Sequence, residues 1–380
     1  MYNFVCSGLW RGGMSGYAAS LLTYIAGGFA EEGEPVRLLC LSNHRLSKRD
    51  PYVTSTPDMK QLQEAGVEIT TLQRSADQPA NEMTAQERRP LTAWLAVPGC
   101  KTIVVFGQDC LKTLCASTDL SKQFVVVQLD PLLAQPDPNS DEMRFLRQVL
   151  DNGTVQRVIV DSKAERQFYV ETGMPKGRFL TIGPGIDLSK FEYNHRHMEE
   201  RSFLFLPIGD PDRVRVVFIA THSRQTPAQA QLMRRAAKLF LKRSPLNCIL
   251  WWGSGKSLAN IANQRLLDFR NIRQDCLASL LCAADSCVLA AGGDRLMPEV
   301  FLGAAALGLR PILPGPATTE LLPDVAITME QGTASPQAFM DLWLQPGASL
   351  QLTSDQREAI NIHIAAISYD QLFNDEEYDE

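Results

Sequence analysis

The segment formed by residues 157–191, RVIVDSKAERQFYVETGMPKGRFLTIGPGIDLSKF, constrains the fold more than any other part of the chain. It contains an apolar run, a serine that precedes an amphipathic stretch, a second short apolar run and then GPGID at residues 183–187. A strand, a helix and a strand within a window of this size are typical of a parallel crossover unit. The segment therefore predicts an α/β fold with parallel strands.

The same alternation of apolar runs and helical stretches extends over both halves of the chain. In the first half the apolar runs lie at residues 3–6, 36–41, 67–72, 103–106 and 124–129. The last two are short and rich in β-branched and aromatic residues, as in strands buried on both faces of a sheet. Residues 192–212 interrupt the pattern with charged residues, two His and two Pro, and the alternation restarts at Val214. This order predicts two doubly wound, Rossmann-like domains with a boundary after residue 191.

The composition is that of a folded protein. A chain of 380 residues, with 45% hydrophobic and 21% charged residues, has room for two domains and shows no sign of disorder. The net charge is −6, and the Asp and Glu residues between 375 and 380 supply five negative charges. The rest of the chain is nearly neutral, so we expect no global attraction to DNA or to an acidic membrane surface.

The nine cysteines show no CxxC spacing and no matching His cluster, which argues against a zinc site. Most lie in apolar segments, which favours buried free thiols in a reducing cytoplasm. No apolar run is long enough to span a bilayer, and the N-terminus carries no secretory signal. We therefore expect a cytoplasmic protein without a transmembrane segment.

Residues 157–191 resemble the middle of family-4 glycosyltransferases of the GT-B fold, where a strand with V-I-x-x-S is followed by I-P-N-G-V-D-x-x-x-F. Residues 367–373, ISYDQLF, are similar to the F-S-W-x-x-x-A segment of that family, whose last helix crosses back onto the first domain. The resemblance implies two Rossmann-like domains that face a central cleft. It divides the chain into an acceptor-side domain at 1–191, a nucleotide-sugar donor domain at 192–354, and a crossing helix with an acidic tail at 355–380.

Two motifs of the first half are candidates for ligand contacts. Gly12 and Gly13 follow the first strand and open the first helix, where backbone N–H groups can approach an anion. The resembled family has a G-G-x-x loop here, beside the donor diphosphate and the acceptor; a glycine turn that serves packing alone is the alternative. Asp130 stands in the place of the family's V-x-x-x-H-D loop, which implies an acceptor contact and a catalytic role for its carboxylate.

Two turns of the second half are candidates for diphosphate contacts. THSRQ at 221–225 resembles the start of the family's G-R-x-x-x-x-K-G turn, so Arg224 is expected to stabilise the charge that grows on the departing diphosphate. The residue at the Lys spacing is Gln229. GSGKS at 253–257 is not a P-loop, because Leu250 stands where the first glycine is required. It is similar to the family's I-V-G-x-G-P turn, with Lys256 either at the donor or solvated at the surface.

The segment MPEVFLGAAALGLRP at 297–311 resembles the family motif E-x-F-G-L-x-x-x-E-A-M-A-x-G-x-P. The two acids of that motif fall on Arg295 and Gly303, and neither residue is acidic. Glu299 lies one helical turn before Gly303, so its carboxylate is expected to take over the ribose contact; a role in capping the helix N-terminus is the alternative. The resemblance also assigns donor binding to Asp294, Leu296, Met297 and Glu320.

The resemblance implies a metal-independent hexosyltransferase, active with retention of configuration, that uses a nucleotide sugar as co-substrate and no cofactor. The acceptor is left open between a glycan, a lipid, a protein and a nucleobase, and a homo-oligomer is one option for its assembly. The alternative is a catalytically degenerate GT-B protein that binds a nucleotide sugar or serves as a partner subunit. The loss of both signature acids and of one cation is the reason for keeping that alternative.

Overall fold

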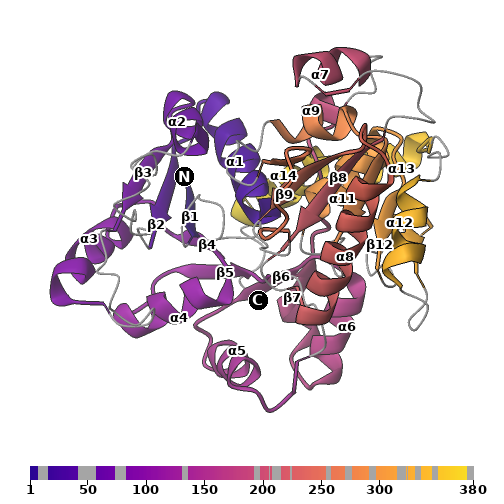
Figure 1. Cartoon of the computed structure of the whole chain (residues 1–380). Helices are drawn as coiled ribbons and strands as arrows, with labels where there is room; N and C mark the ends of the chain where they lie inside the picture. The colour runs from indigo at the N-terminus through magenta and orange to yellow at the C-terminus, as the bar shows by residue number, and fades with distance from the viewer. Residues whose placement is uncertain are drawn as a thin grey trace. The chain divides into compact units, whose positions relative to one another are not determined.

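The structure is a computed structural model of the chain. It describes residues 1–6, 16–41, 57–72, 83–130, 136–191, 197–204, 206–207, 215–222, 225–253, 258–269, 276–290, 297–314, 322, 324–329, 335–344 and 350–374. The chain forms two compact units (Figure 1), of which unit 1 consists of residues 1–183 and 365–380 and unit 2 of residues 184–364.

Unit 1 contains a sheet of seven strands in the order β3-β2-β1-β4-β5-β6-β7. All neighbouring strands are parallel, and β1 pairs with both β2 and β4. The chain therefore winds outward in both directions from the point between β1 and β4. The strands are β1 (Tyr2–Cys6), β2 (Val36–Cys40), β3 (Glu68–Thr71), β4 (Thr102–Phe106), β5 (Phe124–Gln128), β6 (Arg157–Val160) and β7 (Phe179–Thr181).

Helices of unit 1 alternate with these strands and begin at side chains suited to capping. Thr84, Ser140 and Ser162 each accept a hydrogen bond from the backbone N–H three residues later, which satisfies a donor that the helix itself leaves unpaired. The helices are α1 (Gly16–Glu31), α2 (Pro57–Glu64), α3 (Ala85–Leu95), α4 (Gln108–Ser117), α5 (Asp141–Asp151) and α6 (Lys163–Glu171), and the 3-10 helix η2 is Lys176–Arg178.

The C-terminal helix α14 (Ile362–Asn374) packs with unit 1 from residue 365 onward. The Tyr369 hydroxyl donates a hydrogen bond of 2.5 Å to Gln128 Oε1, and its ring stacks on Phe106 with 6.3 Å between centroids. Near the end of the helix, Asp370 accepts a hydrogen bond of 2.8 Å from the Tyr2 hydroxyl. These contacts confirm that the last helix belongs to the N-terminal sheet.

Unit 2 contains a parallel sheet of six strands in the order β10-β9-β8-β11-β12-β13. Alternate residues of β8 enter two different cores: Val216, Phe218 and Ala220 on one face, Val217 and Ile219 on the other. The strands are β8 (Val216–Thr221), β9 (Cys248–Gly253), β10 (Leu266–Asp268), β11 (Ser286–Leu289), β12 (Pro311–Leu313) and β13 (Ile327–Thr328). The prediction of two doubly wound, Rossmann-like sheets is therefore confirmed.

Helices of unit 2 cover both faces of this sheet. One core contains residues of α9 (Leu277–Cys282) and α11 (Pro298–Ala306), and the other contains residues of α8 (Pro227–Arg243) and α12 (Pro336–Leu344). The shorter elements are η3 (Leu188–Phe191), α7 (His197–Phe203) and α13 (Ser354–Ala359). Among the described residues, no helix is long and apolar enough to cross a membrane.

The two units divide the chain at residues 183–184, ahead of the sequence-based boundary at residue 192. Ile186 explains why this segment groups with unit 2, because its N–H donates to the Ile360 carbonyl and its carbonyl accepts from the Ile362 N–H. Gly185 permits this approach, since a Cβ atom there would lie 2.6 Å from Ile362 Cα. In α7, the buried Arg201 forms an ion pair of 2.6 Å with Asp285. This helix lies in residues 192–212, the segment that interrupts the sequence pattern, and it also belongs to unit 2.

Candidate functional site

The topological switch point of unit 2 lies between the neighbouring strands β8 and β11. From β8 the chain continues to β9 on one side of the sheet, and from β11 it continues to β12 on the other side. Ligands of open parallel sheets bind at such a point, outside the carboxyl ends of the strands. Thr221 ends β8, and His222 follows it. On the β11 side, residues 291–296 lie outside the described residues, and Met297 leads into α11. After Ala290, the start of α11 is therefore the next described segment beyond β11.

Glu299 stands in the first turn of α11 and is 6% exposed. Every residue of this helix is buried, and Glu299 is the one acidic residue in it. A helix N-terminus carries partial positive charge and stabilises a carboxylate in its first turn. Met297, also buried, precedes the helix and forms no side-chain cap with it. The carboxylate is thus held at the carboxyl edge of the sheet by a helix that the core surrounds.

Gly303, one turn further along α11, faces the core. A Cβ atom on Gly303 would lie 2.5 Å from Cε1 of Phe191 in η3, a distance that real Cβ contacts do not reach. The Phe191 ring therefore stands where a side chain of residue 303 would begin. The structure accounts in this way for the absence of an acid at the second motif position.

The ends of β8 and β9 are locked together at the same edge of the sheet. Gly253 pairs with Thr221 and has a φ of +96°, and a Cβ atom on it would lie 2.1 Å from the Thr221 carbonyl oxygen. Trp251 Nε1 donates a hydrogen bond of 2.8 Å to the Thr221 hydroxyl. The same hydroxyl donates to the Trp252 carbonyl at 3.3 Å. These contacts fix the points from which residues 223–224 and 254–257 depart.

Two glutamines at the start of α8 differ in role. Gln229 completes a capping box with Thr226, because each side chain accepts a hydrogen bond from the other's backbone N–H. The residue at the family's Lys spacing therefore caps a helix. The Nε2 group of Gln225 is buried and donates to no residue that the structure describes. Sequence reasoning missed Gln225, since only the structure reveals that this donor is buried.

In unit 1, Asp130 lies just after β5 and is half-buried. Its Oδ2 atom is 3.9 Å from the Cβ position of Gly107, the residue that precedes α4 and has a φ of +90°. The carboxylate therefore lies close to the N-terminus of α4, which carries no side-chain cap. Phe106 and Gln128, the last residues of β4 and β5, are the residues that Tyr369 of α14 contacts.

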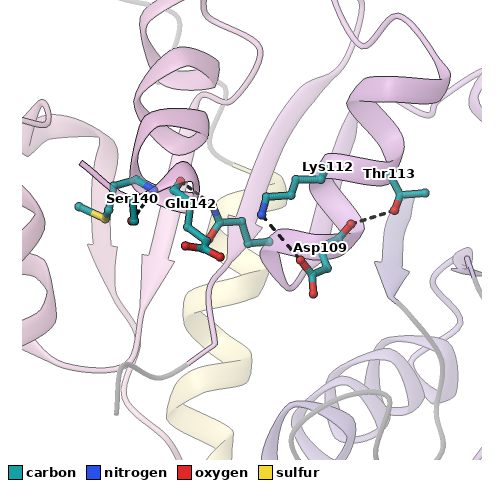
Figure 2. A network of polar contacts seen from close by, with 7 residues as sticks. Asp109, Lys112, Thr113, Ser140 and Glu142 are labelled. Atoms are coloured by element: carbon teal, nitrogen blue, oxygen red, sulfur yellow. Dashed lines mark hydrogen bonds and ion pairs between the residues drawn. The ribbon is translucent and has the colours of Figure 1, made fainter. Parts of the chain in front are cut away.

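Figure 2 shows how the starts of α4 and α5 are joined at this edge of unit 1. Gln108 Nε2 donates a hydrogen bond of 2.7 Å to the Glu142 carbonyl, and Ser140 Oγ accepts one from the Met143 N–H. Lys112 Nζ lies 3.9 Å from Asp109 Oδ1. The hydrogen bond between Gln108 and Glu142 joins residues 34 apart in the chain and so positions the start of α4 against that of α5.

The remaining predicted site residues lie outside the described residues: Gly12, Gly13, Arg224, Lys256, Asp294, Leu296 and Glu320. The structure brings Met297 and Glu299 together at the switch point of unit 2 and places Asp130 at the carboxyl edge of unit 1. Within the described part of the chain, no three His, Cys, Asp or Glu side chains form a group that could hold a metal ion.

Comparison with solved structures extends the likeness to nearly the whole chain. Anabaena HepE in complex with UDP and glucose has 14% identity and a TM-score of 0.68, covering 98% of this chain and 99% of that chain. Sucrose-phosphate synthase from Thermosynechococcus elongatus has 16% identity and a TM-score of 0.66, covering 98% of each chain. A glycosyltransferase from Rickettsia africae has 12% identity and a TM-score of 0.65, covering 98% of this chain and 97% of that chain. Neither a protein-family model nor a curated protein matches the sequence.

Proposed function

We propose that this chain, which has the GT-B fold of the solved glycosyltransferases, moves a sugar from a nucleotide sugar to an acceptor. The observation that carries the proposal is the buried Glu299 in the first turn of α11, the helix that follows β11 at the switch point of unit 2. A buried carboxylate at the ligand-binding edge of a Rossmann-like sheet suits the hydroxyl groups of a ribose. A structural neighbour was solved with UDP and glucose and again with UDP-glucose, which supports the same class of donor.

On this proposal, different groups at the carboxyl edge of unit 2 bind different parts of the nucleotide-sugar donor. Glu299 accepts hydrogen bonds from the ribose hydroxyls, with Asp294, Leu296, Met297 and Glu320 around the sugar and nucleoside. Arg224, the Gln225 amide and the N-terminus of α8 face the diphosphate, because cations and N–H donors stabilise the charge that grows on the leaving group. Lys256 adds a second cation from the turn that Gly253 begins.

The acceptor side belongs to unit 1 on the same proposal. Gly12 and Gly13 offer backbone N–H groups after β1, and Asp130 supplies a carboxylate after β5. The acceptor is a hydroxyl-bearing molecule or a nucleobase that Asp130 orients for attack. Retention of configuration and independence of metal ions are part of the proposal because of the sequence resemblance.

A thermal-shift panel of nucleotides and nucleotide sugars tests donor binding, because a ligand that binds only the folded state raises its stability. We expect a nucleoside diphosphate and its sugar conjugate to raise the melting temperature more than the nucleoside does. Arg224→Ala should reduce the shift for UDP, or for whichever nucleotide binds, and leave that for the nucleoside unchanged. A panel without any stabilising nucleotide would contradict the proposal.

Turnover is measured with the donor that binds. Release of nucleoside diphosphate, with transfer of the sugar to water or to an added acceptor, supports transfer; chelation of divalent metal ions should leave the rate unchanged. A donor that binds tightly with no detectable turnover would favour a nucleotide-sugar binding or partner subunit. Gln229 and Gly303 stand where the resembled family has a Lys and an acid, and these two differences make binding without transfer a specific alternative.

A further inference from the structure

Helix α8 carries a concentration of positive charge that the proposed sugar transfer does not use. Its sequence, PAQAQLMRRAAKLFLKR, contains five cationic residues and no acidic residue. The cations are Arg234, Arg235, Lys238, Lys242 and Arg243. The chain as a whole has a net charge of −6. This helix is therefore a local exception to the charge of the whole molecule.

The positive charges of α8 lie on the side of the helix that faces away from the sheet. Met233, Ala236, Ala237, Phe240 and Leu241 are buried in the core that α8 shares with α12, and Figure 1 shows α8 along the outside of that unit. The exposed cations recur at the helical spacing of three to four residues, which places them on one face; they are Arg235, Lys238, Lys242 and Arg243. The side chains of these four form no hydrogen bond or ion pair with a described residue.

Two leucines stand exposed beside these cations. Leu239 on the same helix is 37% exposed, and Leu246 in the turn after it is 42% exposed. We define the basic face of α8 as Arg235, Lys238, Leu239, Lys242, Arg243 and Leu246. Cations around exposed aliphatic side chains are the combination by which a helix lies on a lipid surface, with apolar groups entering the headgroup region.

We propose that the basic face of α8 binds the surface of a lipid bilayer that contains anionic lipids. Each Lys or Arg near such a surface contributes about 1 kcal/mol, which is roughly fivefold in the partition coefficient. The net charge of −6 of the whole chain does not oppose this binding, because charges beyond about 8 Å are screened at physiological salt. A nucleic acid is the weaker fit, since the face carries no aromatic side chain on which a base could stack.

The test is co-sedimentation of the full chain with vesicles of phosphatidylcholine, with and without phosphatidylglycerol. We expect binding to the anionic vesicles, weakening as salt is raised, and no binding to pure phosphatidylcholine. The triple variant Arg235→Ala, Lys238→Ala, Lys242→Ala should lower the partition coefficient about 100-fold. A control variant, Arg88→Ala, Arg89→Ala, Lys176→Ala, removes the same charge from exposed positions of unit 1 and should bind like the wild type.

Three results would overturn the proposal. The first is absence of binding to anionic vesicles at low salt, and the second is an equal loss of binding in the two triple variants. The third is tight, salt-dependent binding of duplex DNA by a protein that does not sediment with vesicles, which would make the face a nucleic-acid site. Leu239→Ser with Leu246→Ser should weaken vesicle binding even where salt has screened the charges. Donor binding by the Arg235, Lys238, Lys242 variant should be unchanged, so the test stands apart from sugar transfer.

Discussion

The Phe191 ring occupies the space that a side chain on Gly303 would need, with Cε1 of the ring 2.5 Å from the Cβ position of residue 303. The two residues come from the two motifs on which the family resemblance rests most heavily. Phe191 ends η3, the short helix that follows GPGID, and Gly303 lies in the middle of α11. The packing of one motif against the other therefore excludes the acid that the resembled family carries at position 303.

Gly303→Ala is expected to destabilise unit 2 although alanine favours helices. A new Cβ atom at this distance must displace the Phe191 ring, and overpacking of this kind costs about 1–3 kcal/mol, more than the roughly 1 kcal/mol that alanine gains over glycine in a helix. Gly303→Glu should be worse because it also buries a charge. The free energy of unfolding in urea measures both effects.

Gly28→Ala in α1 is the matched control, since nothing lies within 4 Å of its Cβ position. That variant should be as stable as the wild type or more stable. Phe191→Ala combined with Gly303→Ala should lose less stability than the sum of the two single losses, because the double variant has no clash to relieve. Additive losses in the double variant would show that the two residues do not compete for space.

Local sequence patterns sufficed to predict the two parallel sheets, but not the packing of the last helix. The apolar runs at 103–106 and 124–129 became β4 and β5 because fully buried strands need continuous hydrophobicity. The C-terminal helix could be assigned to the first sheet only through resemblance, since its contacts, Tyr369 with Gln128, join residues far apart in the chain. No local pattern encodes such a pairing.

The candidate site was less accessible to sequence reasoning, and the reasons differ by residue. Glu299 could be placed because helical spacing relates it to Gly303. The capping role of Gln229 depends on where α8 begins, a boundary that patterns locate poorly. The division of the chain at residues 183–184 depends on the backbone approach of Gly185 to Ile362, which is a long-range contact.

Tyr369→Phe should loosen the C-terminal helix from unit 1. Tyr369 is fully buried, and its hydroxyl donates to the buried Gln128 side chain at 2.5 Å. Removal of the hydroxyl leaves Gln128 Oε1 buried without this donor, which costs about 1–3 kcal/mol. Hydrogen exchange of residues 365–374 should become faster. Tyr169→Phe is the control, because the Tyr169 hydroxyl bonds to no described residue. Equal protection of α14 in wild type and Tyr369→Phe would contradict this.

The stability of the protein should fall as pH rises from about 10 to about 12, in part through Tyr2. Burial, together with the hydrogen bond to Asp370, raises the pKa of the Tyr2 phenol from 10.0 to about 12. The folded state therefore holds this proton after the unfolded state has lost it, so the stabilisation is complete below pH 10 and is lost as pH approaches 12. Urea unfolding at several pH values should show a shallower decline for Tyr2→Phe. Parallel curves for the two proteins would exclude Tyr2 as a cause.

Glu299→Gln should reduce donor hydrolysis or transfer at least about tenfold, which corresponds to about 1.4 kcal/mol of transition-state stabilisation. The amide keeps the shape of the side chain but loses the charge that the α11 N-terminus stabilises and that, on the proposed function, the ribose hydroxyls contact. The melting temperature should change little, because volume and burial are preserved. Glu358→Gln, at an exposed position of α13, is the control for charge. Wild-type kcat/KM in Glu299→Gln would remove this carboxylate from the site.

Gln225→Met and Gln229→Met should have opposite effects, although both change a glutamine at the start of α8. The Nε2 atom of Gln225 is buried and donates to no described residue, so an apolar replacement should leave stability equal or raise it. If that donor serves the diphosphate, binding of the nucleoside diphosphate should weaken about threefold to tenfold, the value of one neutral hydrogen bond. Gln229→Met breaks the capping box and should lower stability with little effect on binding. Isothermal titration beside urea unfolding separates the two effects, and unchanged nucleotide affinity in Gln225→Met would assign this amide to packing alone.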